Sequence, residues 1–492
     1  MRKILLAQII FLFFGCGDPA GENAYKINKI VEICSPAGIT AEALLKAGKV
    51  AEEEYILPNG RRLTPAGDLI ALGQFPLGLA LDQSEKFAYI VPNDDKNNSL
   101  VVIDLNEKKI IQTVKGMRTF RGVAVSPDNQ YLYVGGASSG TLHRFTIGQT
   151  GEVSDQKNYF LGGYIAALAI PPDGGYIYAV SNTNSKVFKF SAADEEVVSV
   201  FKAGQFPYDA VLSKDGKKLF ISNLAAGTVL GLDTESGNAL FEIKVGKNPQ
   251  VMVLNKSGAL LFVANSDSDT VSVIDLAQEK VVNTIDLTGN PFFFKAGSVN
   301  GLAVTADDKY LLATHAMMNK IEIVDLADFK PKGDIPAGWY PTEVKVTKEG
   351  PEILALSSKG FGSIGDLDNI PGFLQIIAFP DDAALAAYSA TVKANNERAE
   401  KFFEEICSPE TIPALSGKDS PIKHVVLIVR ENKTYDMVLG DFERGDGDPS
   451  LTLFGKDITK NLHKIAEEFV NMDNFYSNPE NSLQGHLWTT QK

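Results

Sequence analysis

The sequence predicts a mainly all-β chain, a seven-bladed β-propeller, followed by a helix and a truncated α/β segment. Three observations support this fold class. Internal similarity recurs with a period of about 42 residues, the length of one propeller blade. Each repeat alternates short apolar strands with polar turns, as half-buried strands do. A different pattern near the C-terminus, the continuous apolar run at residues 423–430, is typical of a buried parallel strand.

The N-terminus has the features of an export signal. Arg2 and Lys3 precede an apolar run at residues 4–14, which is followed by Gly15 and Cys16. The run is too short to span a bilayer as a helix and suits a signal peptide. Gly15-Cys16 resembles a lipobox, so residues 1–16 are expected to be a lipoprotein signal peptide ending at a lipidated Cys16. The alternative is a plain secretory signal with Cys16 removed.

A lipidated Cys16 predicts that the protein lies in the periplasm or on the outer surface, with the membrane as a partner through a lipid anchor.

The composition argues against nucleic acid as a partner. The 492-residue chain has a formal net charge of −14. Because phosphate contacts need a basic face, no nucleic-acid partner is expected.

Residues 60–380 contain the repeats. The clearest units share the phrase Gly-x-x-Pro followed by an apolar strand, and degenerate units can be recognised by their spacing. The seven units begin at Gly73, Gly116, Gly162, Gly204, Gly246, Gly297 and Gly338. A single four-stranded sheet cannot bury both of its faces, whereas neighbouring sheets packed around an axis can. The repeats therefore predict seven blades.

The two ends of the repeat region predict how the ring closes. The last unit supplies three strands, at residues 343–346, 353–356 and 373–378, and then reaches a helix start at Pro380-Asp381. Residues 62–72 precede the first phrase and have no blade of their own. We expect them to form the outer strand of the seventh blade.

Two further cysteines lie outside the propeller, Cys34 in the N-terminal extension (residues 17–59) and Cys407 after the helix. Each stands in the sequence Glu-Ile-Cys-Ser-Pro. An even pair in an exported protein favours a disulfide, and ring closure brings the flanking segments together. We expect a Cys34–Cys407 disulfide; the alternative is two free thiols.

The phrase at residues 265–276, Asn-Ser-Asp-Ser-Asp-Thr-Val-Ser-Val-Ile-Asp-Leu, is similar to the YVTN family of β-propeller repeats. That resemblance implies the propeller fold and leaves the function open, because such propellers occur as binding modules, surface-layer components and enzyme appendages. The expected partner is an unknown protein or small-molecule ligand on a propeller face. His143 and His315 lie within blades without a cluster around them, so we expect each to be a structural or surface residue and not a ligand, and we expect Met317-Met318 to fill a blade loop.

A helix is predicted from Asp381 or Asp382 to about Glu405, and a Pro-, Ser- and Gly-containing linker follows within residues 381–421. The C-terminal segment, residues 422–492, opens with the apolar strand at 423–430. Chemistry in α/β folds sits at the carboxyl ends of such strands. Here the strand ends in Glu431-Asn432-Lys433-Thr434-Tyr435-Asp436, and a helical stretch is expected at residues 462–469.

This segment resembles the phosphoesterase branch of the alkaline phosphatase superfamily, which includes bacterial phospholipase C and related acid phosphatases. The resemblance implies that Glu431 and Asn432 ligate a divalent metal (Zn, Mn, Mg or Ca) through oxygen atoms. It implies that Ser482 is the catalytic nucleophile, with His486 beside it. Two positions depart from the family pattern, Lys433 in place of Arg and Gln484 in place of Asp.

Two functions follow from these patterns. The superfamily needs further Asp and His ligands downstream, which the 492 residues do not contain, so the sequence is either a fragment or a shortened reading frame. We expect an inactive phosphoesterase segment on a lipid-anchored propeller that acts as a binding or scaffold module. The alternative is a metal-dependent phosphoesterase completed downstream. A redox propeller carrying quinone or haem is weakly supported, because there is no Cys-x-x-Cys-His and no His cluster.

Overall fold

The structure is a computed structural model that describes residues 8–12, 48–57, 60–93, 99–288, 297–361, 371–406, 424, 426–430 and 433–473. It divides into two compact units. The propeller unit comprises Ala47–Leu57 and Arg61–Glu397, and the terminal unit comprises Met1–Lys46, Pro58–Gly60 and Arg398–Lys492. Each unit is considered by itself.

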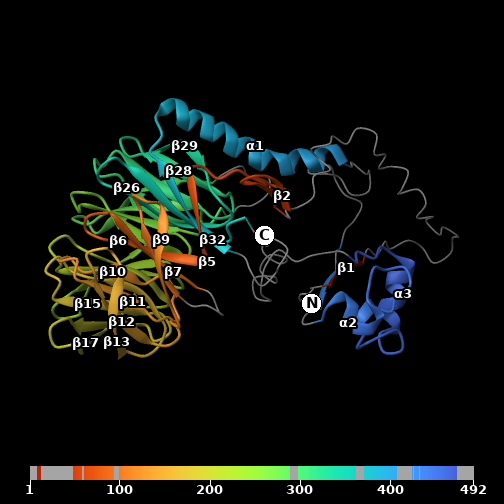
Figure 1. Ribbon diagram of the computed structural model, residues 1–492, viewed down its shortest axis with the longest axis horizontal. Helices are drawn as coiled ribbons and strands as arrows, with labels where there is room; N and C mark the ends of the chain where they lie inside the picture. Colours follow the sequence, from red (N-terminus) through yellow and green to blue (C-terminus); the bar gives the residue numbers. More distant parts are fainter. Residues whose placement is uncertain are drawn as a thin grey trace. The chain divides into compact units, whose positions relative to one another are not determined.

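The propeller unit contains seven four-stranded antiparallel sheets, which follow one another in chain order from orange to cyan in Figure 1. We number them as blades 1 to 7, each from its innermost strand outwards. Blade 1 is β6 (Pro76–Leu81), β7 (Phe87–Pro92), β8 (Ser99–Asp104) and β9 (Lys109–Lys115); blade 2 is β10 (Val123–Val125), β11 (Tyr131–Gly135), β12 (Thr141–Ile147) and β13 (Val153–Phe160). Blade 3 is β14 (Ile165–Ala169), β15 (Tyr176–Ser181), β16 (Lys186–Ser191) and β17 (Glu196–Lys202); blade 4 is β18 (Pro207–Leu212), β19 (Lys218–Asn223), β20 (Thr228–Asp233) and β21 (Ala239–Lys244). Blade 5 is β22 (Pro249–Leu254), β23 (Leu260–Asn265), β24 (Thr270–Asp275) and β25 (Lys280–Asp286); blade 6 is β26 (Val299–Val304), β27 (Tyr310–His315), β28 (Lys320–Asp325) and β29 (Lys330–Pro336). Blade 7 is β30 (Pro341–Val346), β31 (Glu352–Ser357), β32 (Pro371–Ala378) and β5 (Asp68–Gln74).

The inner strands form a closed ring. Each inner strand contacts the inner strand of the next blade, and β30 of blade 7 contacts β6 of blade 1. The seven-sheet ring predicted from the repeats is therefore confirmed. Such closure leaves no inner edge open to solvent.

Apolar side chains hold the blades together. The third residue of the second strand is a large buried ring in blades 1 to 5, namely Tyr89, Tyr133, Tyr178, Phe220 and Phe262, each at most 2% exposed. An aromatic side chain buries roughly 150–250 Å² and so dominates the packing where it stands. The same buried ring therefore recurs in the first five blades.

Ring closure differs in detail from the prediction. The N-terminal strand of blade 7 is β5, which pairs with β32 through Ile70 opposite Leu374 and Leu69 opposite Gln375. Its bounds are Asp68–Gln74 rather than residues 62–72. Arg62 and Leu63 instead form β4 (Arg62–Leu63), because they pair with β3 (Glu54–Ile56) in a separate sheet completed by β2 (Gly48–Ala51).

The helix predicted after blade 7 is present as α1 (Asp382–Ile406). The Asp381 carboxylate accepts a hydrogen bond from the Ala384 amide at 2.8 Å and so caps its first turn. Within the propeller unit, Leu385 packs into the core shared by blades 6 and 7, and the Ser389 hydroxyl accepts from the Asp334 amide at 2.9 Å. The first part of α1 thus covers the outer side of blade 6.

The terminal unit contains β1 (Gln8–Leu12), β33 (Val426–Arg430), α2 (Tyr435–Leu439), the 3-10 helix η2 (Pro449–Leu451) and α3 (Lys460–Glu468). A strand and a helix near the predicted positions are confirmed. The parallel pairing is not, because β33 pairs antiparallel with β1, and Val426 and Ile428 are about half exposed. The strand that pairs with β33 thus belongs to the apolar run that the sequence predicts as part of a signal peptide.

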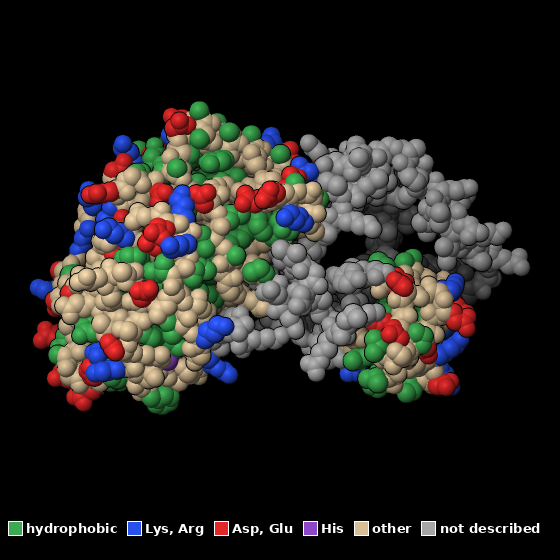
Figure 2. Space-filling view, viewed as in Figure 1, with side chains coloured by type: hydrophobic (Ala, Val, Ile, Leu, Met, Phe, Trp, Pro, Cys, Tyr) green, Lys and Arg blue, Asp and Glu red, His purple; other side chains and the backbone are tan. Residues whose placement is uncertain are grey.

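Two general features of the described residues complete the fold. None of their helices is both long and apolar enough to cross a membrane. Figure 2 shows acidic and basic side chains interspersed over the visible face of the propeller unit. On that face the propeller surface carries charges of both signs.

Candidate functional site: an axial pocket of the propeller

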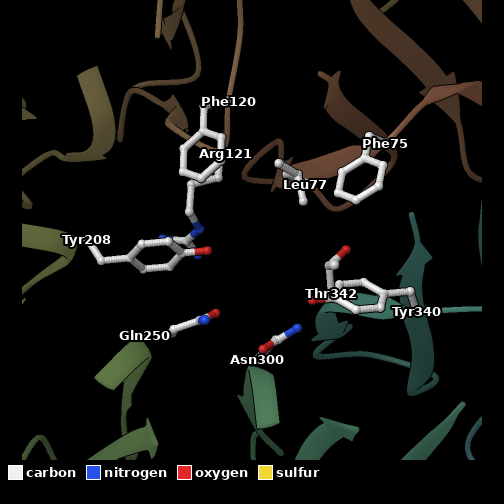
Figure 3. Close-up of a pocket in the computed structure, with 9 residues that line it drawn as sticks. All are labelled: Phe75, Leu77, Phe120, Arg121, Tyr208, Gln250, Asn300, Tyr340 and Thr342. Carbon is white, nitrogen blue, oxygen red and sulfur yellow. The ribbon is translucent and has the colours of Figure 1, made fainter. Parts of the chain in front are cut away.

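A pocket lies where the inner strands converge on the propeller axis. Its cavity volume is about 140 Å³. Six of the seven blades contribute to its lining, which Figure 3 shows as sticks: Phe75, Leu77, Phe120, Arg121, Tyr208, Gln250, Asn300, Tyr340 and Thr342. No blade could form this pocket alone, so it exists only because the ring closes.

Most of the lining comes from one position of the repeat. The second residue of the inner strand, directly after the proline of the Gly-x-x-Pro phrase, is Leu77 in blade 1, Tyr208 in blade 4, Gln250 in blade 5 and Thr342 in blade 7. Asn300 has the same place in blade 6. The residues around this position repeat, whereas the position itself varies in size and polarity.

The segment before each inner strand, called here the axial loop, brings aromatic rings to the pocket. Phe75 and Tyr340 stand directly before the prolines of blades 1 and 7, with positive φ angles of 54° and 63°. Bulky residues rarely adopt this left-handed backbone, which costs on the order of 1–3 kcal/mol. The same loop position has positive φ in blades 4, 5 and 6, at Phe206, Asn248 and Ser298. Ring contacts connect Phe75 to Tyr340 at 6.3 Å between centroids and Phe120 to Tyr208 at 6.0 Å.

Arg121 crosses the axis at the base of the pocket. Its guanidinium lies 2.6 Å from Asp209 Oδ1 in blade 4 and 3.1 Å from Glu343 Oε2 in blade 7. Burial alone would lower the pKa of Arg121, but the two carboxylates outweigh it and raise the pKa above its usual range. The side chain therefore stays charged, with that charge paired inside the protein. This pairing connects blades 2, 4 and 7.

The polar side of the pocket has hydrogen-bonding capacity that the protein leaves open. In Figure 3 the Tyr208 hydroxyl and the amides of Gln250 and Asn300 point into the cavity. Among the described residues, the Gln250 amide and the Tyr208 hydroxyl have no hydrogen-bond partner, and Asn300 accepts one bond through Oδ1, from Ser298 Oγ at 3.0 Å. Burial raises the pKa of Tyr208 to about 12, so its hydroxyl is neutral and can donate.

A buried charged cluster lies close behind the blade 6 wall. His315 Nε2 is 2.9 Å from Glu322 Oε2, and Lys320 Nζ lies between Glu322 Oε2 at 3.0 Å and Asp334 Oδ1 at 2.9 Å. Burial would raise the pKa of Glu322, but His315 and Lys320 lower it to about 2. His315 pairs in register with Val299, the residue next to Asn300. We call His315, Lys320, Glu322 and Asp334 the blade 6 cluster.

The residues singled out for chemistry in the sequence lie mostly outside the described ranges. This applies to Cys16, Cys34, Cys407, Glu431, Asn432, Ser482 and His486. Their neighbours Thr434 and Asp436 are described: the Thr434 hydroxyl caps α2 by accepting from the Met437 amide at 3.2 Å. Within the described part of the chain, no three His, Cys, Asp or Glu side chains form a group suited to a metal ion.

The histidines singled out in the sequence lie in different blades. His143 is on β12 of blade 2, where its Nδ1 lies 2.6 Å from Asn158 Oδ1 and burial lowers its pKa. His315 is on β27 of blade 6. Met317 and Met318 follow it in the turn before β28, and their carbonyl oxygens accept hydrogen bonds from Arg61 and Asn396. The structure does not bring the two histidines together.

The sequence analysis missed the axial pocket, although a signal was present. At the position after the repeated proline, the side chain can differ from blade to blade at little cost to the fold. Comparing Leu77, Tyr208, Gln250 and Thr342 across the repeats would have found it. Arg121 was harder to recognise because its blade lacks the proline.

Comparisons with known proteins agree with this fold. Residues 71–298 match the family described as the cytochrome D1 heme domain, so this part of the propeller is similar to that family. The match ends before the C-terminal segment and gives no support to a phosphoesterase domain there. No curated protein matches the chain.

Among solved structures, the chain is similar to the hydrazine synthase of Kuenenia stuttgartiensis. The TM-score is 0.53 at 19% sequence identity, over 62% of this chain and 95% of that chain. At this level of identity the likeness shows the fold alone.

The name of the matched family raises the question of haem. Haem iron is held by axial His, Cys, Met or Tyr ligands. The axial pocket is lined by two tyrosines but by no His, Cys or Met. Its volume of about 140 Å³ is also below the roughly 300 Å³ at which pockets for drug-sized ligands begin. A haem is too large for this cavity, so the residues of the axial pocket do not fit the group.

Proposed function

We propose that this protein is an exported, lipid-anchored binding module whose propeller takes a small ligand in the axial pocket. One observation carries the proposal: six blades converge on a single cavity, and each presents a side chain from a position that otherwise varies freely. Concave sites with aromatic walls and a few placed polar groups are where proteins bind small molecules. The Gln250 amide and the Tyr208 hydroxyl, which no described residue hydrogen-bonds, supply donors and an acceptor for the polar groups of such a ligand.

The experiment is a ligand-observed NMR screen of small ring compounds, charged and uncharged, against the purified protein. The test variant is Gln250→Trp, which fills the cavity from a half-exposed position. Gln205→Trp is the matched control, because Gln205 is an exposed glutamine of the blade 4 axial loop that does not line the pocket. We expect binding by the control and none by Gln250→Trp. Equal binding by both variants would show that the ligands lie elsewhere.

The location of the module is part of the proposal. The basic and apolar start of the chain and Gly15-Cys16 support export and lipidation at Cys16, which would place the propeller at the membrane in the periplasm or on the outer surface. Fractionation of cells expressing the chain and its Cys16→Ser variant tests this. We expect the first in the membrane fraction and the second released or retained as precursor.

A phosphoesterase activity is a second candidate. One feature supports it: β33 ends at Arg430, directly before Glu431 and Asn432, and α2 begins shortly after with Thr434 as its cap. That is where the resemblance puts metal ligands, at the end of a strand. Hydrolysis of p-nitrophenyl phosphate and its bis-ester with Zn²⁺, Mn²⁺, Mg²⁺ or Ca²⁺, beside Ser482→Ala, tests it. Turnover lost in that variant would establish the activity, and no turnover with any metal would leave binding as the function.

A further inference from the structure

The charge balance of the axial pocket selects against charged ligands. Arg121 is its one cationic lining residue, and that charge is paired with Asp209 and Glu343. An anion would have to compete with two carboxylates already in place, and a cation would meet the guanidinium. Because buried charges are costly unless paired, a ligand that adds a net charge would disturb this arrangement. The pocket therefore suits an uncharged ligand.

Its walls offer ring faces on two sides. Phe75 and Tyr340 form one aromatic pair, from blades 1 and 7, and Phe120 and Tyr208 form the other, from blades 2 and 4. All four are only partly buried, so part of each ring remains available. Rings of this kind pack on the apolar faces of a ligand while their edges and hydroxyls contact its polar groups. The ligand should be a ring with at least one apolar face.

The third side of the axial pocket offers both hydrogen-bond donors and hydrogen-bond acceptors. The Gln250 amide has two N–H donors and one carbonyl, Asn300 has its N–H₂ group, and Tyr208 has a neutral hydroxyl. Groups of this kind can satisfy several hydroxyls at once, each of which both donates and accepts. A ligand with carbonyl oxygens alone would use only the donors and leave the Gln250 carbonyl oxygen unpaired.

Size gives the last criterion. A cavity of about 140 Å³ is below the roughly 300 Å³ at which pockets for drug-sized ligands begin, so it suits a small ligand of one ring. A ring with apolar faces, a rim of hydroxyls and no charge is a sugar ring. We propose that the axial pocket binds a single uncharged sugar ring, either a free monosaccharide or the terminal ring of a glycan. This inference rests on the proposed function and names its ligand class.

The test is saturation-transfer NMR on the purified protein with methyl β-D-glucopyranoside, methyl β-D-galactopyranoside and N-acetylglucosamine. The disaccharide N,N′-diacetylchitobiose distinguishes a glycan terminus from a free monosaccharide. For one ring, Kd values on the order of 1 mM are expected. The variants are Gln250→Ala and Tyr208→Phe, each of which removes hydrogen-bonding groups, and the matched control is Gln205→Ala. 1,4-Naphthoquinone serves as an uncharged ring without hydroxyls.

We expect at least one sugar to bind, with affinity roughly fivefold weaker in Gln250→Ala and Tyr208→Phe and unchanged in Gln205→Ala. Circular dichroism of each variant checks that the propeller is intact. If naphthoquinone binds in a Gln250→Trp-sensitive way and no sugar does, the sugar assignment is overturned and the pocket stands as the ligand site. If neither kind of ring binds, both the sugar assignment and the proposed function fail.

Discussion

Blades 5 and 6 have the same backbone pairing and different polar side chains between their strands. In blade 5, buried Asn265 accepts from the Gly246 amide at 3.1 Å and donates to Thr270 Oγ1 at 3.1 Å and Ser272 Oγ at 2.9 Å. In blade 6 the residues at the same positions belong to the blade 6 cluster. Asn265 pairs in register with Thr270 in blade 5, and His315 pairs with Lys320 in the same way in blade 6.

The difference shows which part of the blade sets the fold. Both blades keep the alternating apolar residues along their strands and the turns between the strands. Both therefore form the same antiparallel hydrogen-bond ladder. The polar interior can then be neutral, as in blade 5, or ionic, as in blade 6. A neutral set is satisfied by local hydrogen bonds, whereas an ionic set depends on each of its charges. Blade 6 should therefore be more sensitive to substitution and to pH than blade 5.

The largest effect is expected when one charge of the blade 6 cluster is removed. Lys320→Met leaves the buried Glu322 and the partly buried Asp334 without their cation, which should lower the free energy of unfolding by about 3–5 kcal/mol. Thr270→Val, at the corresponding site of blade 5, removes one neutral hydrogen bond and should cost about 1 kcal/mol. Urea denaturation of both variants measures the two costs. A smaller cost for Lys320→Met than for Thr270→Val would break the comparison.

The next effect is a pH dependence specific to blade 6. The pKa of Glu322 in the folded protein is about 2, against about 4.5 as its ordinary value. A depressed carboxyl pKa stabilises the fold at pH values above 4.5 and loses this contribution as the pH falls toward 2. Over that range wild type should lose on the order of 2–3 kcal/mol more than Glu322→Gln. Urea midpoints at pH 6, 4 and 3 measure it, and parallel losses in the two proteins would contradict the assignment.

A smaller effect is expected when the blade 6 cluster is replaced as a whole. The variant His315→Asn/Lys320→Thr/Glu322→Ser/Asp334→Thr gives blade 6 the set found in blade 5. Exchange of an entire buried ionic set is often near neutral, so stability should stay within about 2 kcal/mol of wild type at pH 7. The pH dependence between 4.5 and 2 should be reduced as in Glu322→Gln. A loss as large as that of Lys320→Met would show that the backbone of blade 6 needs its charges.

The smallest expected effect concerns the turns that hold the next axial loop. Asn319 Oδ1 accepts from the Tyr340 amide at 3.2 Å, and Asp269 Oδ1 accepts from the Ser298 amide at 2.9 Å. Asn319→Ala and Asp269→Ala should each cost about 1 kcal/mol. Both should also weaken ligand binding by a few-fold, because Tyr340 lines the axial pocket and the Ser298 hydroxyl donates to Asn300, which lines it too. Urea denaturation measures the loss of stability and ligand titration the loss of affinity.

Much of the fold could be predicted because it is local and repeated. Four Gly-x-x-Pro phrases and three degenerate units at the same spacing predicted seven inner strands, and Asp381 marked the start of α1. Errors arose where an assignment depended on a partner far away in the chain. Residues 62–63 could be recognised as a strand but not assigned to the sheet of β3, and the apolar strand at 426–430 could not be assigned to β1.

Little of the candidate site could be predicted from its residues taken one at a time. Gln250 alone is an unremarkable polar residue in a strand, and Arg121 looks like a surface cation. Arg121 is 88 residues from Asp209 and 222 residues from Glu343, so no local pattern connects them. The sequence motifs that did suggest chemistry, around Glu431 and Ser482, point to another part of the chain.

By itself the sequence determined the export signal pattern, the seven repeats and the way the chain returns to complete its last blade. These follow from short-range physics: hydrophobic alternation, turn residues and a period that fits one sheet. Only the tertiary structure decided that Leu77, Arg121, Tyr208, Gln250, Asn300 and Thr342 face one cavity and that Arg121 is neutralised there. The reason is that a closed ring brings one position of every repeat to a common axis, and the chemistry of the resulting pocket is a property of the set.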